Sequence, residues 1–370
     1  MPGALGGVLS LNPKRSLRCF IASLDNQVKP LQLNRRESGS EFLAKTCRPL
    51  RTRNLSQPKR VGSALLGYSG NPCRRRLSLS TMSPNFELDK FEALGNDFLI
   101  GVVDAPPERL DQNYVRRICD RRFGIGADGL IISAITPGPP QSATMMLYNA
   151  DGTRAEMSGN GIRCLAHALW RRGLIASPRF DIATDAGVKE VQAQGRADGD
   201  LAHIQVEMGK VSYLGAPFSI AENFGGVDYL GTELEIGNPH LVFVPFAQLE
   251  GALGGVDLDT LDLAVLGPVI EARYEHGINI EWVSLSTTPG EVDLRVWERG
   301  AGITLACGTG STASAYLLIN QGLSGPAVAV RNPGGVLVLK RDPDNETMLL
   351  VGPSSFVATI SPAAQLLYES

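Results

Sequence analysis

Two short stretches of this sequence follow the same plan: a small nucleophilic residue lies in a glycine-rich turn that opens directly into an apolar, helix-forming run. Ser158 lies in the first, at 157–161, and Cys307 lies in the second, at 306–310. At the N-terminus of a helix, free N–H groups and the positive end of the helix dipole favour negative charge, lower the pKa of a cysteine and attract a carboxylate. The pattern therefore predicts two anion-binding loops that can act as acid and base.

A Gly-Asn turn precedes each of these nucleophiles at a similar distance. Gly95 stands 63 residues before Ser158, and Gly237 stands 70 residues before Cys307. In each half, the residues between turn and nucleophile predict a strand, a helix, a strand and a polar loop. We infer an internal repeat of about 130 residues and duplicated domains that meet face to face, each contributing one nucleophile. Coincidence between two glycine-rich stretches is the alternative.

The body of the chain has the pattern of an α+β fold. Residues 180–184, 188–192 and 203–208 alternate with period two, which predicts strands that complete an antiparallel unit. The basic segment 114–122 predicts a short helix. The expected domains are 83–211, completed by 354–370, and 212–353.

Residues 1–82 differ in composition from the rest of the chain. They contain fifteen Lys/Arg and three Asp/Glu, whereas the remaining residues contain 20 and 35. An Arg- and Ser-rich, acid-poor segment without periodicity is typical of a disordered or targeting sequence. Two interpretations stay open, a plastid or mitochondrial transit peptide and an over-extended start ahead of Met82. A nucleic-acid-binding arm is disfavoured because the body is acidic and has no basic patch interleaved with aromatic residues.

Several other kinds of site are disfavoured by the same sequence. Of the six cysteines, three lie in the leader, and Cys119, Cys164 and Cys307 are scattered through the body, which argues against a disulfide framework. There is no C-x-x-C and the four histidines are far apart, so no metal site is expected. No apolar run approaches the ~20 residues that span a bilayer. The G-x-G-x-x-G match at 124–129 follows a predicted helix and precedes a strand, the reverse of the dinucleotide fingerprint, so we expect a tight loop.

Two acid/base groups that face each other across a domain interface suit one task especially. One group removes a proton from one face of a carbon, and the other delivers a proton to the opposite face. A thiol of pKa roughly 8.5, lowered by a helix N-terminus, gives an appreciable thiolate at neutral pH. The same N–H groups can hold a carboxylate and stabilise a carbanion as it develops. This chemistry needs no metal or cofactor in principle.

The motifs also carry a resemblance to a known family. Six of them, in register, closely resemble those of diaminopimelate epimerase, and the similarity covers residues 86–360. The resemblance implies a cofactor-independent, two-base epimerase that interconverts LL- and meso-diaminopimelate. It further implies two pseudo-symmetric α+β domains, each a mainly antiparallel sheet wrapped around a central helix. The motifs are Leu94-Gly95-Asn96-Asp97-Phe98, Asn149-Ala150-Asp151-Gly152, Gly159-Asn160-Gly161-x-Arg163-Cys164, Gly237-Asn238-Pro239-His240, Glu298-Arg299-Gly300 and Ala306-Cys307-Gly308-Thr309-Gly310.

The resemblance assigns a role to each matching residue. Cys307 would be one acid/base, and Glu298 with Arg299 would hold the amino and carboxylate ends of the substrate. Taken singly, each matching asparagine is equally well explained as a turn residue, and His240 as a residue that caps its loop. The main-chain N–H groups for the reacting carboxylate would come from Gly159, Asn160, Gly308 and Thr309, and the asparagines that line the pocket would be Asn96, Asn149, Asn238 and Asn279.

Partners and location follow from the same resemblance. The implied partner is a small molecule, diaminopimelate, with no nucleic acid and no membrane, and a homodimer is left open. The cytoplasm is expected if the chain is bacterial. The plastid stroma is expected if residues 1–82 are a transit peptide.

Ser158 departs from the family pattern, which has the second catalytic cysteine at this position. The pKa of a serine hydroxyl lies roughly 5 units above that of cysteine, so its anion is on the order of 7 kcal/mol harder to form. Ser158 is therefore a poor base, but it can donate a proton or relay one to water or a nearby base. Cys164 is not a substitute, since a small buried apolar role is expected for it.

Three hypotheses about function follow. The chain is a diaminopimelate epimerase that uses serine at position 158. Alternatively, it is a related racemase, epimerase or dehydratase that acts on another amino acid such as a hydroxyproline. The third hypothesis is a non-catalytic binding or structural homologue, and the retention of Cys307, Glu298 and Arg299 argues against it.

Overall fold

A computed structural model describes residues 87–362 of the chain, with gaps at 106, 139, 196–198 and 253–254. The basic leader 1–82 and the last expected residues of the first domain, 363–370, lie outside the described residues.

The first repeat begins with a hairpin whose turn brings a predicted site residue to the start of a strand. Leu94 and Gly95 both have positive φ, 57° and 84°, as a two-residue hairpin turn of this hand requires. Asn96 follows at once, paired with Ala93. The elements of this repeat are β1 (Leu88–Ala93), β2 (Asn96–Val102), α2 (Gln112–Cys119), β3 (Gly129–Ser133), β4 (Ile135–Thr136), β5 (Ser142–Thr144), β6 (Met146–Asn149), β7 (Arg154–Ala155), α3 (Gly159–Arg171), β8 (Arg179–Thr184), β9 (Gly187–Gln194) and β10 (Leu201–Gly209).

The second repeat has the same plan, with two short strands ahead of it. The turn that contains Gly237, with φ of 80°, joins the first long strand of the repeat to the next. The elements are β11 (Ser212–Tyr213), β12 (Ile220–Phe224), β13 (Val227–Glu235), β14 (Pro239–Pro245), α4 (Phe246–Leu249), the 3-10 helix η2 (Leu258–Thr260), α5 (Leu263–Glu271), β15 (Asn279–Leu285), β16 (Glu291–Glu298), β17 (Gly302–Ile303), α6 (Gly308–Asn320), β18 (Ala327–Asn332), β19 (Gly335–Arg341) and the long strand β20 (Met348–Ile360).

Strand pairing matches the two repeats element by element. β2 pairs with β3 in parallel across α2, and β14 pairs with β15 in parallel across α5. In each repeat an antiparallel strand follows, β6 beside β3 and β16 beside β15, and then a short hairpin leads to the nucleophile. The predicted internal duplication is therefore confirmed, and Ser158 and Cys307 occupy equivalent places in it.

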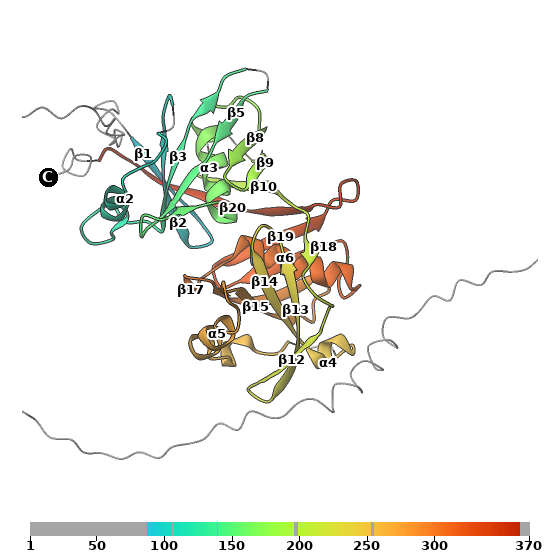
Figure 1. Cartoon of the computed structure of the whole chain (residues 1–370). Helices are drawn as coiled ribbons and strands as arrows, with labels where there is room; N and C mark the ends of the chain where they lie inside the picture. The colour runs from blue at the N-terminus through green and yellow to red at the C-terminus, as the bar shows by residue number, and fades with distance from the viewer. Residues whose placement is uncertain (1–86, 106, 139, 196–198, 253–254, 363–370) are drawn as a thin grey trace, which may run out of the picture. The chain divides into compact units, whose positions relative to one another are not determined.

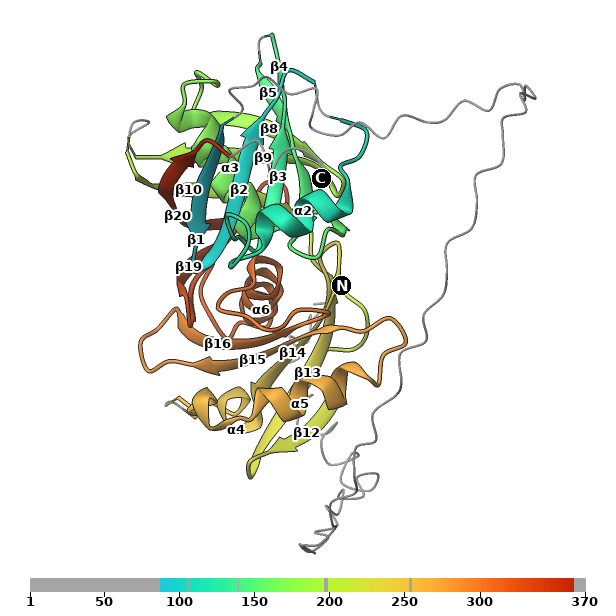
Figure 2. The same cartoon turned by 90° about the vertical axis from the view of Figure 1, so that its left-hand side faces the viewer.

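Each repeat wraps its sheet around one central helix, α3 or α6. α3 packs against β1, β2, β9, β10 and β20, and α6 packs against β14, β15, β18 and β19. Figure 2 shows α6 nearly end-on with strands curving beside it, and Figure 1 shows α3 next to β8–β10. Most residues of both helices are buried, as expected for central helices rich in apolar and small residues.

The strand β20 links the two repeats. Its first residues pair with β19 of the second repeat and with β10 of the first, and its later residues pair with β1. A C-terminal segment that completes the first repeat was expected from 354 onward, and the pairing with β10 already begins at Met348. The exact domain limits stay a prediction.

The segment between α2 and β3 differs in one detail from the sequence-based expectation. The helix predicted to reach residue 122 ends at Cys119, because the carboxylate of Asp120 accepts hydrogen bonds from the N–H groups of Arg122 and Phe123 and turns the chain. The G-x-G-x-x-G match that follows is a loop leading into β3, as predicted.

Candidate active site

The two predicted nucleophiles cap the two central helices in the same way. Ser158 is the N-cap of α3, and its Oγ accepts a hydrogen bond of 3.1 Å from the N–H of Gly161. Cys307 is the N-cap of α6, and its Sγ accepts one of 3.4 Å from the N–H of Gly310. Both residues have extended backbone, as N-caps require. The equivalence that the sequence predicts therefore holds in geometry.

The N-termini of α3 and α6 touch through two glycines. A Cβ added to Gly159 would lie 3.2 Å from the Cα of Gly308, and a Cβ added to Gly308 would lie 3.2 Å from the Cα of Gly159. Such a distance is tighter than ordinary van der Waals contact, so side chains at these positions would push the helix ends apart. The residues that follow the two nucleophiles are thus glycines because the helix ends approach so closely.

Four main-chain N–H groups of these first helical turns are free. The N–H groups of Gly159, Asn160, Gly308 and Thr309 have no acceptor in the part of the chain that the structure describes. The first N–H groups of a helix have no partner within the helix and carry its positive dipole end. The four groups are therefore suited to a carboxylate, as the resemblance implies.

The side chain of Asn160 is fully engaged within the protein. Its Nδ2 donates to the carbonyl oxygen of Ala306 at 3.2 Å and to Oδ1 of Asn96 at 3.3 Å. Its Oδ1 accepts from Nη2 of Arg163 at 2.7 Å. Only the main-chain N–H of Asn160 is left for a ligand, and the side chain ties the turn before Cys307 to the first repeat.

The environment of Cys307 differs from the sequence-based expectation of a lowered pKa. The side chain is 4% exposed, and burial, followed by the charges of Glu298 and Glu281, raises its pKa well above the usual value. Hydrogen bonds with Thr309 and with the N–H of Gly310 oppose this effect but do not outweigh it. Burial and the two carboxylates therefore favour the thiol form of Cys307 in the ligand-free protein, against the hydrogen bonds from the first turn of the helix.

Glu298 ends β16 and lies beside Cys307. Burial raises the pKa of Glu298, and hydrogen bonds with Thr304 and Cys307 lower it to a lesser extent. Thr304 Oγ1 donates to one carboxylate oxygen. In the duplicated architecture, Asn149 ends β6 just as Glu298 ends β16, so the two halves place different polar groups at the same point.

A buried pair behind the first turn of α6 was missed by the sequence analysis. His240 Nδ1 lies 2.7 Å from Oε1 of Glu281, and both side chains are fully buried. A Cβ added to Gly310 would lie 2.2 Å from the same carboxylate oxygen, so the carboxylate packs directly against α6. His240 Nε2 lies 3.0 Å from Oδ1 of Asn238, consistent with a role in capping its loop. A charged residue between two large apolar ones, Ile280 and Trp282, was the signal that could have identified Glu281.

Asn279 joins two of the predicted motifs. Its Nδ2 donates to the carbonyl oxygen of Pro239 at 2.9 Å, and its Oδ1 accepts from the N–H of Arg299 at 3.0 Å. The guanidinium of Arg299 is exposed and donates to the carbonyl oxygen of His276 at 3.2 Å. The amide of Asn279 therefore fixes the main chain at Arg299 and leaves the guanidinium at the surface.

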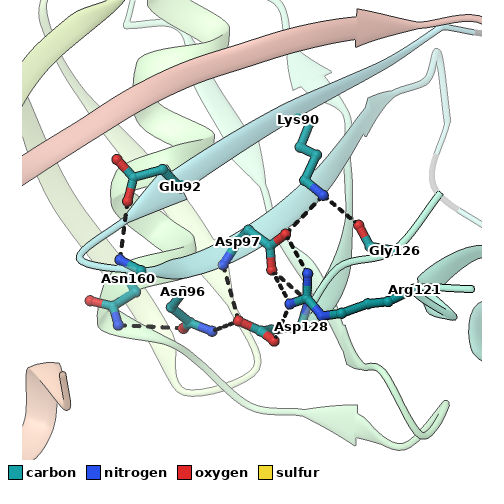
Figure 3. Close-up of polar contacts among 9 residues, drawn as sticks. Lys90, Glu92, Asn96, Asp97, Arg121, Gly126, Asp128 and Asn160 are labelled. Carbon is teal, nitrogen blue, oxygen red and sulfur yellow. Dashed lines mark hydrogen bonds and ion pairs between the residues drawn. The ribbon is translucent and has the colours of Figure 1, made fainter. Parts of the chain in front are cut away.

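Asn96 is held by a carboxylate on the loop before β3 (Figure 3). Its Nδ2 donates to Oδ2 of Asp128 at 2.6 Å, and its Oδ1 accepts from Asn160. With both ends of the amide engaged, the second hydrogen of Nδ2 is the group left for a ligand.

Asp128 belongs to an ion-pair network that the sequence analysis missed (Figure 3). Arg121 Nη2 lies 2.7 Å from Asp128 and 2.6 Å from Asp97, and Lys90 Nζ lies 2.9 Å from Asp97. Lys90 also donates to the carbonyl oxygen of Gly126 at 2.6 Å. Burial raises the pKa of Asp97, but hydrogen bonds and charges of Arg121 and Lys90 outweigh it and hold the pKa at about 2. The network fixes the glycine-rich loop against β1 and β2 and so fixes Asn96.

Asn149, another predicted site residue, ends β6 opposite Gly129, next to the Asp128 loop. It is exposed, and its Nδ2 donates to Oγ1 of Thr153 at 3.1 Å within its own turn. Cys164, by contrast, behaves as predicted, since it is fully buried in α3 and burial raises its pKa to about 12.

Metal ligands and membrane spans were also sought in the described part of the chain. Residues 87–362, as described, contain no group of three or more His, Cys, Asp or Glu that could hold a metal ion. Among the same residues, no helix combines the length and apolarity needed to cross a bilayer.

Comparison with known proteins places this geometry in a family. The model of the diaminopimelate epimerase family matches the chain twice, at residues 90–214 and 233–357. The chain belongs to the diaminopimelate epimerase family. The two matches fall on the two repeats, one on each nucleophile.

Individual diaminopimelate epimerases match over nearly their whole length. The enzyme of Desulforudis audaxviator is 35% identical over 285 residues, which cover 73% of this chain and 97% of that protein. The enzyme of Corynebacterium glutamicum is 37% identical over 281 residues, which cover 73% of this chain and 95% of that protein.

Solved structures share the diaminopimelate epimerase fold at low sequence identity. A probable proline racemase from Agrobacterium radiobacter has a TM-score of 0.56 at 14% identity and covers 76% of this chain and 93% of its own. A hydroxyproline epimerase from Agrobacterium vitis has a TM-score of 0.53 at 15% identity and covers 76% and 94%. At such identities the likeness shows the fold alone, so it does not favour hydroxyproline over diaminopimelate as substrate.

Proposed function

We propose that this chain interconverts LL- and meso-diaminopimelate by moving protons on opposite faces of the α-carbon, with Cys307 on one face and Ser158 on the other. The observation that carries this proposal is the contact between Gly159 and Gly308, which brings the N-termini capped by the two nucleophiles together. A substrate carboxylate at the free N–H groups of both helices would hold the α-carbon between the two side chains.

Cys307 acts as the base once substrate is bound. The two carboxylates of Glu298 and Glu281 raise the pKa of its thiol in the free protein. The α-ammonium group of an amino acid substrate would bring a positive charge beside these carboxylates and offset their effect, which lowers the pKa of Cys307. The thiolate then takes the α-proton, and the helix N–H groups stabilise the negative charge that develops on the carboxylate.

Ser158 completes the reaction as a proton donor. Its hydroxyl delivers a proton to the opposite face of the carbanion, which leaves Cys307 as a thiol and Ser158 as an alkoxide. The alkoxide is on the order of 7 kcal/mol less accessible than a thiolate. It therefore takes a proton back, through water, as Cys307 returns to its starting state.

Polar groups around the site suit a substrate with two amino acid ends. Glu298 lies beside Cys307 at the reacting end, whereas Asn96, Asn279 and Arg299 come from other strands and loops, so they can hold the end that does not react. A site that is built to bind polar groups rejects analogues that lack them, because its own buried groups would be left without partners. A substrate with a single amino acid end, such as hydroxyproline, leaves more of these groups without a partner.

Exchange in D2O tests this function. Purified protein incubated with LL- or meso-diaminopimelate is expected to incorporate α-deuterium with inversion, followed by NMR, and Cys307→Ala is expected to abolish both. Exchange without inversion would overturn the two-face mechanism. Turnover of hydroxyprolines alone would support the related racemase, and no exchange with any of these substrates would support a non-catalytic homologue.

Location and assembly are further expectations that rest on this function. We expect the bacterial cytoplasm, or the plastid stroma if residues 1–82 direct import. The mass of the protein isolated from its native cells would distinguish a mature start near Met82 from a start at Met1. Light scattering of the purified protein tests whether it forms a homodimer.

A further inference from the structure

Arg163 is a fully buried cation whose acceptors are all neutral. It lies in the first turns of α3 and is 0% exposed. Its guanidinium donates to the carbonyl oxygen of Gly159 at 2.8 Å, to Oδ1 of Asn160 at 2.7 Å and to the carbonyl oxygen of Pro353 at 3.3 Å. Among the described residues, no carboxylate forms an ion pair with it. Burial of an unpaired charge is unfavourable, so such a residue calls for an explanation.

The guanidinium keeps its charge despite burial. Burial lowers the pKa of Arg163 to about 10, which still leaves it protonated at neutral pH. It is hydrogen-bonded to the carbonyl oxygen of Gly159 and to Oδ1 of Asn160, so it adds fixed positive charge in the first turn of α3. The unpaired charge is therefore held within the first turn of the helix that Ser158 caps.

Through Asn160, the hydrogen bonds of Arg163 affect the second repeat. Arg163 accepts nothing, so the group of Asn160 that faces it must be the oxygen, and Nδ2 of Asn160 must point the other way. That Nδ2 donates to the carbonyl oxygen of Ala306, which directly precedes Cys307, and to Asn96. The orientation of one amide thus connects the first repeat to the turn that carries Cys307.

The strand β20 is shaped to accept this guanidinium. A Cβ added to Gly352 would lie 3.0 Å from Nε of Arg163 and 2.5 Å from Cδ2 of Leu337. The glycine lets the strand approach closely enough for the carbonyl of Pro353 to accept its hydrogen bond. Arg163 is thereby held between the first turn of α3 and β20, so its guanidinium has little freedom to move.

We propose that Arg163 is a positioning residue, which orients Asn160 and through it holds the Cys307 turn in register with the N-terminus of α3. The effect of Arg163 on catalysis rests on the proposed function. Its effect on the position of the Cys307 turn does not depend on a substrate, so the structural effect and the catalytic effect can be tested separately.

The substrate-independent test is alkylation of Cys307 by iodoacetamide, followed on its own peptide by mass spectrometry. Arg163→Met keeps the length and removes the donors, and Arg163→Lys keeps the charge but cannot hold all three acceptors. Both are expected to accelerate alkylation of Cys307 about tenfold at fixed pH, because the turn opens locally. The alkylation rate of the buried Cys119 is expected to stay unchanged, which separates local opening from unfolding.

Asn160→Ala is a second test variant, and Arg171→Met is the control. Asn160→Ala removes the link to Ala306 but keeps Arg163, so it is expected to accelerate Cys307 alkylation to the same extent. Arg171→Met removes a cation from the other end of α3, where it pairs with Asp200, and is expected to change nothing. Native alkylation rates in both Arg163→Lys and Asn160→Ala would overturn the proposal, even if Arg163→Met fails to fold.

The effect on catalysis is tested by measuring kcat and KM for the epimerisation of diaminopimelate. A misplaced Cys307 turn is expected to lower kcat about 100-fold in Arg163→Lys while KM changes far less, because the retained charge still attracts the carboxylate. A kcat within a few-fold of the native value would count against the proposal. If the native protein itself does not turn over diaminopimelate, the proposed function fails, whereas the alkylation arm still decides the role of Arg163.

Discussion

His240 Nδ1 and Glu281 Oε1 lie 2.7 Å apart, fully buried behind the helix that Cys307 caps. After burial and Glu298, the charge of Glu281 is the next cause that raises the pKa of Cys307. Glu281→Gln removes that negative charge and keeps the shape, so the pKa of Cys307 is expected to fall. The rate of Cys307 alkylation, measured against pH, is expected to rise at a lower pH than in the native protein. Glu291→Gln, on a surface pair with Arg331, serves as the control, and an unshifted profile in Glu281→Gln would contradict the assignment.

Ser158→Cys is expected to increase activity. A thiol at this N-cap ionises far more readily than a hydroxyl. The side chain at position 158 can therefore both donate a proton to the α-carbon and take one from it more easily. Since one pKa unit corresponds to about 1.4 kcal/mol, even partial recovery of the difference would raise kcat at least about tenfold. The measurement is kcat in both directions. Ser158→Ala is the companion variant, and activity of Ser158→Ala equal to native would show that the hydroxyl takes no part.

Removal of the Asp128 carboxylate is expected to weaken substrate binding. Asp128→Ala frees Nδ2 of Asn96, which the carboxylate holds at 2.6 Å. A hydrogen bond to a charged group contributes roughly 1.5–3 kcal/mol, so KM is expected to rise about tenfold or more. Steady-state kinetics with diaminopimelate measure this. Glu190→Ala, in a surface pair with Arg179, is the matched control, and equal KM values in the two variants would argue against a role for Asp128.

The stability of the protein is expected to fall in acid through Asp97. Its pKa in the folded protein is about 2, below the usual 3.8, because its partners Arg121 and Lys90 outweigh burial. A lowered pKa contributes stability that is fully present above about pH 4 and is lost as the pH falls toward 2, worth about 2 kcal/mol. Urea unfolding of the native protein and Asp97→Asn between pH 2 and 7 measures it. The difference between the two should shrink toward pH 2, and a constant difference would be inconsistent with this pKa.

Arg172→Met is expected to reduce stability without changing chemistry. Asp89 is 2% exposed and accepts from Arg172 Nη2 at 2.8 Å and from Thr359 Oγ1 at 2.7 Å, so it ties β1 and β20 to the end of α3. Without Arg172 the buried carboxylate loses its charged partner, and the free energy of unfolding is expected to fall by about 3 kcal/mol. Thermal and urea unfolding measure this. A large loss of kcat at a temperature where the variant is folded would contradict a purely structural role.

Local patterns in the sequence were sufficient to predict the fold and the N-caps of the two central helices. A helix that is apolar or small on all sides must be buried, and a small polar residue before a glycine-rich turn is a natural N-cap, so α3, α6, Ser158 and Cys307 could be placed from contiguous residues. The repeat was visible because both halves use the same order of elements. The sequence also names Asn96 and Asn279 as site candidates, but which groups their amides hold is not visible in it.

The residues that the sequence analysis missed act across long separations. Asp128, which is held by Arg121, binds the amide of Asn96 from the loop that follows α2. Glu281 lies on β15, and its charge raises the pKa of Cys307. Asn160 donates to Ala306, which lies 146 positions away in the chain. No local pattern encodes such contacts, because they depend on which strands become neighbours.

The sequence by itself therefore determined the family and the duplicated architecture, and it predicts Ser158 and Cys307 as the two nucleophiles. Only the tertiary structure decided the direction in which the pKa of Cys307 is shifted. The helix N-terminus alone predicts a lowered pKa for Cys307, but burial together with Glu298 and Glu281 raises it, because charges in a water-poor interior interact strongly with one another. Folding brought Glu298 and Glu281 close to Cys307 at the N-terminus of α6, where their charges oppose its ionisation.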